Sequence, residues 1–234
     1  MGSEQILDNI LDIEQQETLL ETAYPFMELM MQYRCAIREI ETKLNVLNDE
    51  FSMQYNRNPI ESVKSRVKKP MSIVDKMKRK GIPLTIENIE QNLNDIAGVR
   101  VICSFSEDIY AVAGMLTSQD DIIVIKWKDY IAHPKDNGYR SLHLILDIPI
   151  FLSGGKKHMK VEVQLRTIAM DFWASLEHKL RYKKNIADSE YISEELKKCA
   201  DVISAMDCRM QEIRIMIEQS REKEETANEN SDCL

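Results

Sequence analysis

The sequence predicts an α+β fold, in which a mixed β-sheet is flanked by helices and extended by helices at both ends. Strand-like and helical segments mix between residues 60 and 167 without the strict strand–helix repeat of a parallel α/β fold. Residues 25–55 and 193–221 carry apolar residues at helical spacing. In a chain of 234 residues that is 44% hydrophobic and 30% charged, these segments can bury a single core.

The N-terminal segment, residues 1–59, is expected to be a helical extension. A weak amphipathic helix is predicted over residues 5–22. Pro25 suits the first turn of a second helix that runs to about Tyr55. The methionine-rich stripe of this second helix is typical of core packing. Residues 56–59, Asn-Arg-Asn-Pro, then break the chain.

The central segment, residues 60–184, is expected to hold the mixed sheet. Strands are predicted over residues 60–67, 98–105, 122–127, 142–150 and 159–166. Helices are predicted over residues 72–80, from Thr85, over 108–116 and over 168–182. Ser153-Gly154-Gly155 forms a turn, so the strands on either side of it should pair as an antiparallel hairpin.

The C-terminal segment, residues 185–221, is expected to form one helix from about Ser193 to Arg221, after a break near Asp188. Apolar residues recur every seven positions in two sets that are offset by three: Leu196, Ile203, Met210 and Ile217, and Cys199, Met206 and Ile213. This is an a/d heptad seam. It favours packing against the long N-terminal helix, with oligomerisation as the alternative. Residues 222–234 are polar and are expected to be disordered.

Charge and cysteine usage limit the class of protein. The formal net charge of −8 argues against binding to duplex nucleic acid. The five cysteines show no paired metal spacing, which indicates reduced thiols in a cytoplasmic protein. The sequence has no run of about 18 apolar residues, so no membrane span is expected.

Two short segments, residues 135–143 and 161–167, predict one polar site. Alternation should place Tyr139, Ser141 and His143 on one face of the first segment. In the second segment, the side chains of Glu162, Gln164 and Arg166 should lie on one face. The apolar side chains of Val161, Val163 and Leu165 should then point into the core. Such a face suits a site that stacks a base and handles phosphates.

A basic cluster follows the first predicted strand, with only Asp75 as an acid between residues 64 and 80. Its basic members are Lys64, Arg66, Lys68, Lys69, Lys76, Lys78, Arg79 and Lys80. The cluster is either a solvated face or a triphosphate clamp. No glycine-rich phosphate loop occurs, so side chains and the helix start near Ser72 would have to bind the phosphates.

Two carboxylates stand out. Glu162 lies mid-strand, where carboxylates are disfavoured, whereas Asp95 could equally be a cap. Together across a sheet they suit one Mg²⁺ that is shared with substrate phosphates. Alternatively, one of them acts as general base toward a sugar hydroxyl. The four histidines lack zinc-ligand spacing.

These segments resemble the synthetase domain of the RelA/SpoT alarmone enzymes, above all the stand-alone small alarmone synthetases of the RelQ kind. The matching motifs are Arg66-Val67-Lys68, Asp95-Ile96-Ala97-Gly98-Val99-Arg100, Lys128-Asp129-Tyr130-Ile131, Lys135-x-Asn137-Gly138-Tyr139-x-Ser141-x-His143 and Glu162-Val163-Gln164-Leu165-Arg166-Thr167. The resemblance implies a nucleotidyltransferase-like sheet. It also implies transfer of pyrophosphate from ATP to the 3′-hydroxyl of GTP or GDP, with GMP left open, releasing AMP in the stringent response.

The resemblance also implies roles for single residues. Asp95 would hold Mg²⁺, and Glu162 would be the base or a second metal ligand. Arg66 and Arg100 would flank adenine, and the ATP phosphates would meet Lys68, Ser72, Lys76 and Arg79. Tyr139 would stack on guanine, and the guanine nucleotide would also meet Lys135, His143 and Gln164. Small synthetases are tetramers, in agreement with the heptad seam.

The chain has no His-Asp dipeptide and little sequence ahead of residue 60, so the hydrolase activity of the long family members is not expected. Two rival functions stay open. One is a toxic relative that pyrophosphorylates the 3′ end of tRNA, which would make single-stranded RNA a partner. The other is a nucleotide or RNA sensor without turnover.

Overall fold

A five-stranded mixed sheet forms the centre of the chain, as the sequence predicts. The computed structural model describes residues 3–55, 57–181 and 189–231. The strands are β1 (Ile60–Val67), β2 (Ala97–Cys103), β3 (Ile123–Asp129), β4 (Leu142–Leu152) and β5 (Gly155–Thr167). Their order is β1-β2-β5-β4-β3. Only the β2–β5 pair is parallel, and β4 and β5 form the expected antiparallel hairpin.

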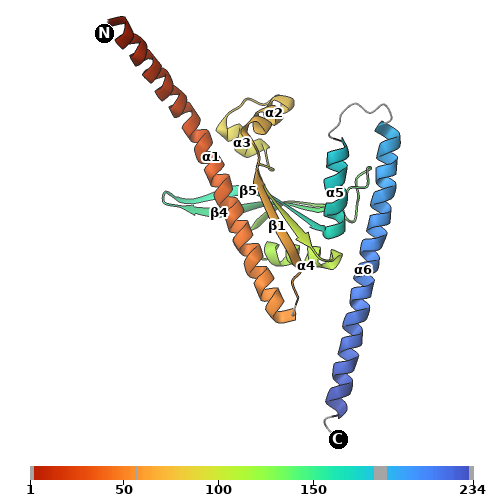
Figure 1. Cartoon of the computed structure of the whole chain (residues 1–234). Helices are drawn as coiled ribbons and strands as arrows, with labels where there is room; N and C mark the ends of the chain where they lie inside the picture. The colour runs from red at the N-terminus through yellow and green to blue at the C-terminus, as the bar shows by residue number, and fades with distance from the viewer. Residues whose placement is uncertain (1–2, 56, 182–188, 232–234) are drawn as a thin grey trace.

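Helices cover the sheet and extend from it (Figure 1). They are α1 (Ser3–Tyr55), α2 (Pro70–Lys80), α3 (Ile86–Asn92), α4 (Ser106–Thr117), α5 (Ile168–Arg181) and α6 (Ser189–Ser231). The helix α1 packs across β1, β2, β4 and β5, and α4 contacts β2, β5 and α1. The helix α5 follows β5 directly and packs against α6.

Alternation over residues 159–165 of β5 gives the sheet one apolar and one polar face. Val161, Val163 and Leu165 are fully buried in the core that the strands share with α1 and α4. The residues between them, Glu162 and Gln164, are half-buried and turn to the opposite face. The predicted division of this strand is therefore confirmed, and the polar face can carry a site.

The N-terminal helix differs from the expectation of two helices. The helix α1 is continuous, and Pro25 lies inside it. A proline in a helix interior removes one backbone hydrogen bond. Leu29, Tyr33 and Ile40 are buried in the core just after it. This packing stabilises the part of α1 that follows Pro25. The helix also continues on the N-terminal side of Pro25, because the proline removes only one backbone hydrogen bond.

The heptad seam of α6 does not pack against α1. Figure 1 shows α6 beside α5, beyond the end of the strands and apart from α1. Leu196 and Ile203 pack near Trp173 of α5, but further along the seam Met210 and Ile217 are 55% and 50% exposed. Since α5 carries the chain away from the end of β5, α6 begins beyond the reach of α1. The prediction that this seam packs against the N-terminal helix is therefore wrong.

The end of α6 also differs from expectation. The helix continues beyond residue 221 to Ser231, where we expected a disordered tail. The predicted break near Asp188 lies outside the described residues, as do residues 232–234 of the tail. In the ranges that the structure describes, no helix combines the length and apolarity that a membrane span requires.

Candidate functional site

The strand register lines up polar side chains across the polar face. One row of directly paired residues crosses all five strands: Lys64, Arg100, Gln164, His143 and Lys128. In the neighbouring row, Arg66 pairs with Gly98, and Gly98 pairs with Glu162. Because a glycine separates Arg66 from Glu162, no side chain fills the space between them.

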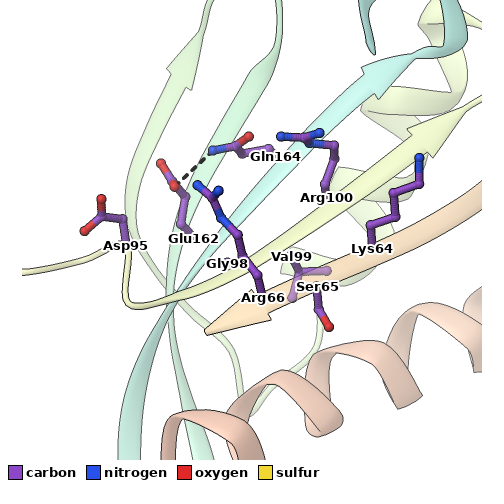
Figure 2. A pocket seen from close by; sticks show the side chains of 9 residues that line it. All are labelled: Lys64, Ser65, Arg66, Asp95, Gly98, Val99, Arg100, Glu162 and Gln164. Atoms are coloured by element: carbon purple, nitrogen blue, oxygen red, sulfur yellow. Dashed lines mark hydrogen bonds between the residues drawn. The ribbon is translucent and has the colours of Figure 1, made fainter. Parts of the chain in front are cut away.

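A pocket of about 170 Å³ opens at this glycine (Figure 2). Its lining residues come from β1, β2, β5 and the turn before β2: Lys64, Ser65, Arg66, Asp95, Gly98, Val99, Arg100, Glu162 and Gln164. Pockets that enclose a whole small molecule usually measure about 300–1,000 Å³. This one fits a group of phosphate size, so a larger ligand would have to extend over the open polar face.

Asp95 is the carboxylate that two lysines of the basic cluster contact. Lys68 Nζ and Lys76 Nζ each donate to Asp95 Oδ2 at 2.6 Å. Burial would raise the pKa of Asp95, but the two ammonium groups outweigh it and hold that pKa below its usual value. The carboxylate is therefore ionised at neutral pH. Its other oxygen, Oδ1, is buried and has no hydrogen-bond partner in the described part of the chain.

Glu162 is a second ionised carboxylate in the same pocket. Gln164 Nε2 donates to Glu162 Oε2 at 3.0 Å, and His143 Nδ1 lies 3.4 Å from Glu162 Oε1. Burial would raise the pKa of Glu162, but the interactions with His143 and Gln164 outweigh it and lower that pKa. The negative charge of Asp95 raises the pKa of Glu162, so the two carboxylates are close enough to interact electrostatically.

The two carboxylates fit a divalent cation that is shared with a ligand. The orphaned Asp95 Oδ1 is an oxygen of the kind that Mg²⁺ prefers. Among the described residues, no group of three or more acidic, histidine or cysteine side chains could hold a metal ion by itself. Mg²⁺ commonly binds one or two carboxylates and completes its coordination with phosphates and water.

The turn before β4 presents an aromatic ring. Gly138 has a φ of +86°, and its N–H donates to the Lys135 carbonyl at 2.8 Å, as expected for a tight Asn-Gly turn. The Tyr139 hydroxyl lies 2.8 Å from His143 Nε2. The ammonium of Lys135 sits 4.9 Å from the centre of the Tyr139 ring. Tyr139 and His143 thus share one hydrogen-bonded unit next to Glu162.

Ser141 is linked to Tyr139 through Arg166, whose Nε donates to the Ser141 hydroxyl at 3.4 Å and whose NH2 donates to the Tyr139 hydroxyl at 2.6 Å. Ser141 is fully buried, and its hydroxyl donates to the Leu165 carbonyl at 3.1 Å. Residues 139–141 precede β4, which begins at Leu142, so strand alternation does not extend to them. Ser141 therefore ties the turn to β5 from a fully buried position.

The helix α2 places the remaining residues that we expected at ATP phosphates. Ile73 and Met77 bury one face of α2. Ser72 lies half-buried in its first turn, and Arg79 is exposed in its last. Neither of the two lines the pocket, whereas Arg66 and Arg100 both do. Figure 2 shows both arginines on the same side of the sheet as Glu162.

Comparison with known proteins gives the family of the chain. A sequence profile described as "Region found in RelA / SpoT proteins" matches residues 65–187, which include β2, β5 and the turn at Tyr139. The chain belongs to the RelA/SpoT family. It is 45% identical to the GTP pyrophosphokinase YwaC of Bacillus subtilis, over 77% of this chain and 86% of that protein. It is 39% identical to the GTP pyrophosphokinase YjbM of the same organism, over 82% and 90% of the two chains.

Solved structures of this family share the fold. The crystal structure of small alarmone synthetase 2 from Bacillus subtilis matches with a TM-score of 0.74 at 43% identity, covering 82% of this chain and 98% of that one. Small alarmone synthetase 1 from Bacillus subtilis, bound to its product pppGpp, matches with a TM-score of 0.74 at 39% identity, over 82% and 97% of the two chains.

Sequence reasoning placed Arg166 on the polar face without giving it a role, and it missed Asp171 altogether. Arg166 NH2 donates to the Tyr139 hydroxyl at 2.6 Å and to Gln164 Oε1 at 3.2 Å. Asp171, in the first turn of α5, accepts from Arg166 and from Arg100. An acid in a first helical turn is common for local reasons, so only the tertiary contact reveals its place here.

Proposed function

We propose that this chain is a GTP pyrophosphokinase that makes guanosine 3′-diphosphate alarmones in the stringent response. It transfers the β- and γ-phosphates of ATP together to the 3′-hydroxyl of GTP or GDP and releases AMP. The observation that carries this proposal is the position of Asp95 and Glu162. These two ionised carboxylates lie between the basic cluster and the unit of Tyr139 and His143.

On the ATP side, Arg66 and Arg100 would flank adenine, since guanidinium groups stack well on flat rings. Lys68, Lys76, Ser72 and Arg79 would receive the phosphates. Both lysines contact Asp95. A cation at Asp95 would take over as its counter-charge, and the two ammonium groups would then be released toward phosphate.

On the guanine side, Tyr139 would supply the stacking platform. Lys135 is exposed and lies over the ring, so an incoming base would displace its ammonium toward the phosphates. Arg166 is 4% exposed and would stay in place beneath the hydroxyl. Gln164 and His143 would then border the ribose next to Glu162.

The chemistry needs little more than positioning and charge neutralisation. The 3′-oxygen forms a bond to the β-phosphorus, and the bond from that phosphorus to the α-phosphate oxygen of AMP breaks. Mg²⁺ held by Asp95 and Glu162 would supply neutralisation of phosphate charge. Glu162 would accept the 3′-hydroxyl proton or orient that hydroxyl. His143 would help to orient Glu162, because a Tyr139 hydroxyl that donates to Nε2 leaves the ring proton on Nδ1, toward Glu162.

The assembly and location of the enzyme are part of the proposal. The exposed seam residues Met206, Met210 and Ile217 support a homo-oligomer through α6, a tetramer as in other small synthetases. The described cysteines carry free thiols, which suits the reducing cytoplasm.

Label transfer tests this function. The protein is incubated with Mg²⁺, γ-labelled ATP and either GDP or GTP, and the products are separated by thin-layer chromatography. Label should move to the guanine nucleotide with the wild type and not with Glu162→Gln, which keeps the shape but cannot hold a negative charge. Asp121→Asn, which breaks an ion pair with Lys43 away from the pocket, should retain transfer. If no label reaches either nucleotide, the proposal fails, and tRNA 3′ ends become the next acceptor to test.

A further inference from the structure

One carboxylate joins the two halves of the proposed site. Asp171 Oδ1 accepts from Arg100 NH1 at 3.2 Å and from Arg166 NH1 at 3.1 Å. Arg100 lies on β2 at the ATP side, and Arg166 lies on β5 at the guanine side. A single oxygen atom on α5 therefore contacts an arginine from each side.

The two arginines need this counter-charge. Burial lowers the pKa of Arg100, and the nearby positive charge of Arg166 lowers it further, while Asp171 acts in the opposite direction. The side chain of Arg166 is only 5% exposed and that of Asp171 only 15%, so water screens them poorly. Without Asp171, the two guanidinium groups would repel each other and separate.

Each arginine is connected onward to groups that the proposed reaction uses. Arg166 donates to the Tyr139 hydroxyl and to Gln164, which in turn donates to Glu162. Arg100 lines the pocket, and its buried Nε has no hydrogen-bond partner in the described ranges. A displacement of either arginine therefore changes the position of Asp171, and through it the position of the other arginine.

We propose that Asp171 is a positioning residue that couples the two nucleotide subsites, so that binding of ATP strengthens binding of the guanine nucleotide and the reverse. ATP fixes Arg100, Arg100 fixes Asp171, and Asp171 fixes Arg166 beneath Tyr139. The inference rests on the proposed function, because it takes Arg100 and Tyr139 as contacts of two different nucleotides.

Binding titration tests the coupling directly. The dissociation constant of GDP is measured by calorimetry with and without saturating α,β-methylene ATP, in which a CH₂ group replaces the oxygen of the bond that breaks. The ratio of the two constants is the coupling factor, and linkage requires the same factor for the analogue with and without GDP. We expect a factor of about 5–150 for the wild type, the usual range for such couplings.

Asp171→Asn should bring this factor close to about 1, since it keeps the shape of the side chain and removes its charge. Asp171→Glu should restore part of the coupling. Asp121→Asn, which loses an ion pair outside the site, should leave it unchanged. If Asp171→Asn weakens both nucleotides equally at an unchanged coupling factor, or changes only the melting temperature, Asp171 is structural and the inference is overturned.

The two proposals fail in different ways. A wild-type protein that transfers label but shows a coupling factor of about 1 refutes the role of Asp171 and leaves the pyrophosphokinase intact. A protein that transfers no label refutes the proposed function, and the inference falls with it.

Discussion

Replacing Gly138 by alanine tests how the turn at Tyr139 is held. A side chain at the observed φ of +86° is strained by about 1–2 kcal/mol. A Cβ atom there would also lie 2.5 Å from the Ala200 Cβ of α6, far inside van der Waals contact. Overpacking of this kind typically costs about 1–3 kcal/mol. Gly138→Ala should therefore lower the free energy of unfolding by about 2–5 kcal/mol and weaken GDP binding.

Variants at two other glycines and at Ala200 separate the cost of backbone strain from the cost of the steric clash. Gly81 has a φ of +67°, and a Cβ atom at this position would meet no described atom within 4 Å, so Gly81→Ala should show only the conformational cost. Gly154 has neither positive φ nor a close neighbour among the described residues, so Gly154→Ala should cost little. Ala200→Gly alone costs about 1 kcal/mol in a helix, but it should offset the clash in the Gly138→Ala background.

Urea unfolding of the four single variants and the double variant measures this cycle. The coupling energy between positions 138 and 200 should be about 1–3 kcal/mol in favour of the double variant. If Gly138→Ala is no more destabilising than Gly81→Ala, or if Ala200→Gly recovers nothing, α6 does not support the turn as described.

Three further perturbations have defined outcomes. Tyr139→Ala should weaken GDP by about 1–3 kcal/mol in calorimetry and leave the ATP analogue unchanged, since only guanine loses its stacking surface; equal weakening of both nucleotides would contradict that role. The pKa of Asp95 lies below its usual 3.8, so its ion pairs stabilise the folded state above about pH 4, and this contribution is lost as the pH falls through the folded pKa. In urea titrations between about pH 5 and about pH 3, Asp95→Asn should therefore lose less stability than the wild type, and parallel curves would refute the pKa shift. Met210→Asp with Ile217→Asp, both at exposed positions, should lower the mass seen by light scattering if the seam joins subunits, whereas an unchanged mass would exclude it.

Local patterns predict most of the sheet and half of the site. The alternation of Val161, Glu162 and Val163 is enough to assign the faces of β5, because strand side chains alternate whatever the fold around them. The Asn-Gly turn before Tyr139 is likewise a local signal. The mixed sheet follows from the mixture of short strands and helices, and the structure confirms it.

The remaining features depend on tertiary contacts, which the sequence pattern does not specify. An amphipathic seam shows that α6 needs a partner but does not say which one, and α5 directs it away from α1. Alternation predicts that Ser141 lines the site, but its complete burial follows from its bond to the Leu165 carbonyl, which only the fold reveals. Asp171 could not be found from its neighbours in sequence, since its partners Arg100 and Arg166 come from two different strands.

The most direct test of the proposed reaction is its stoichiometry. Wild-type protein, Mg²⁺, ATP and GDP are incubated, and every nucleotide is quantified by ion-exchange chromatography. Transfer of both terminal phosphates predicts one AMP for each guanosine 3′-diphosphate product, with no product from 3′-deoxy-GDP. Formation of ADP in place of AMP, or AMP without a new guanine nucleotide, would contradict pyrophosphoryl transfer at the pocket of Asp95 and Glu162.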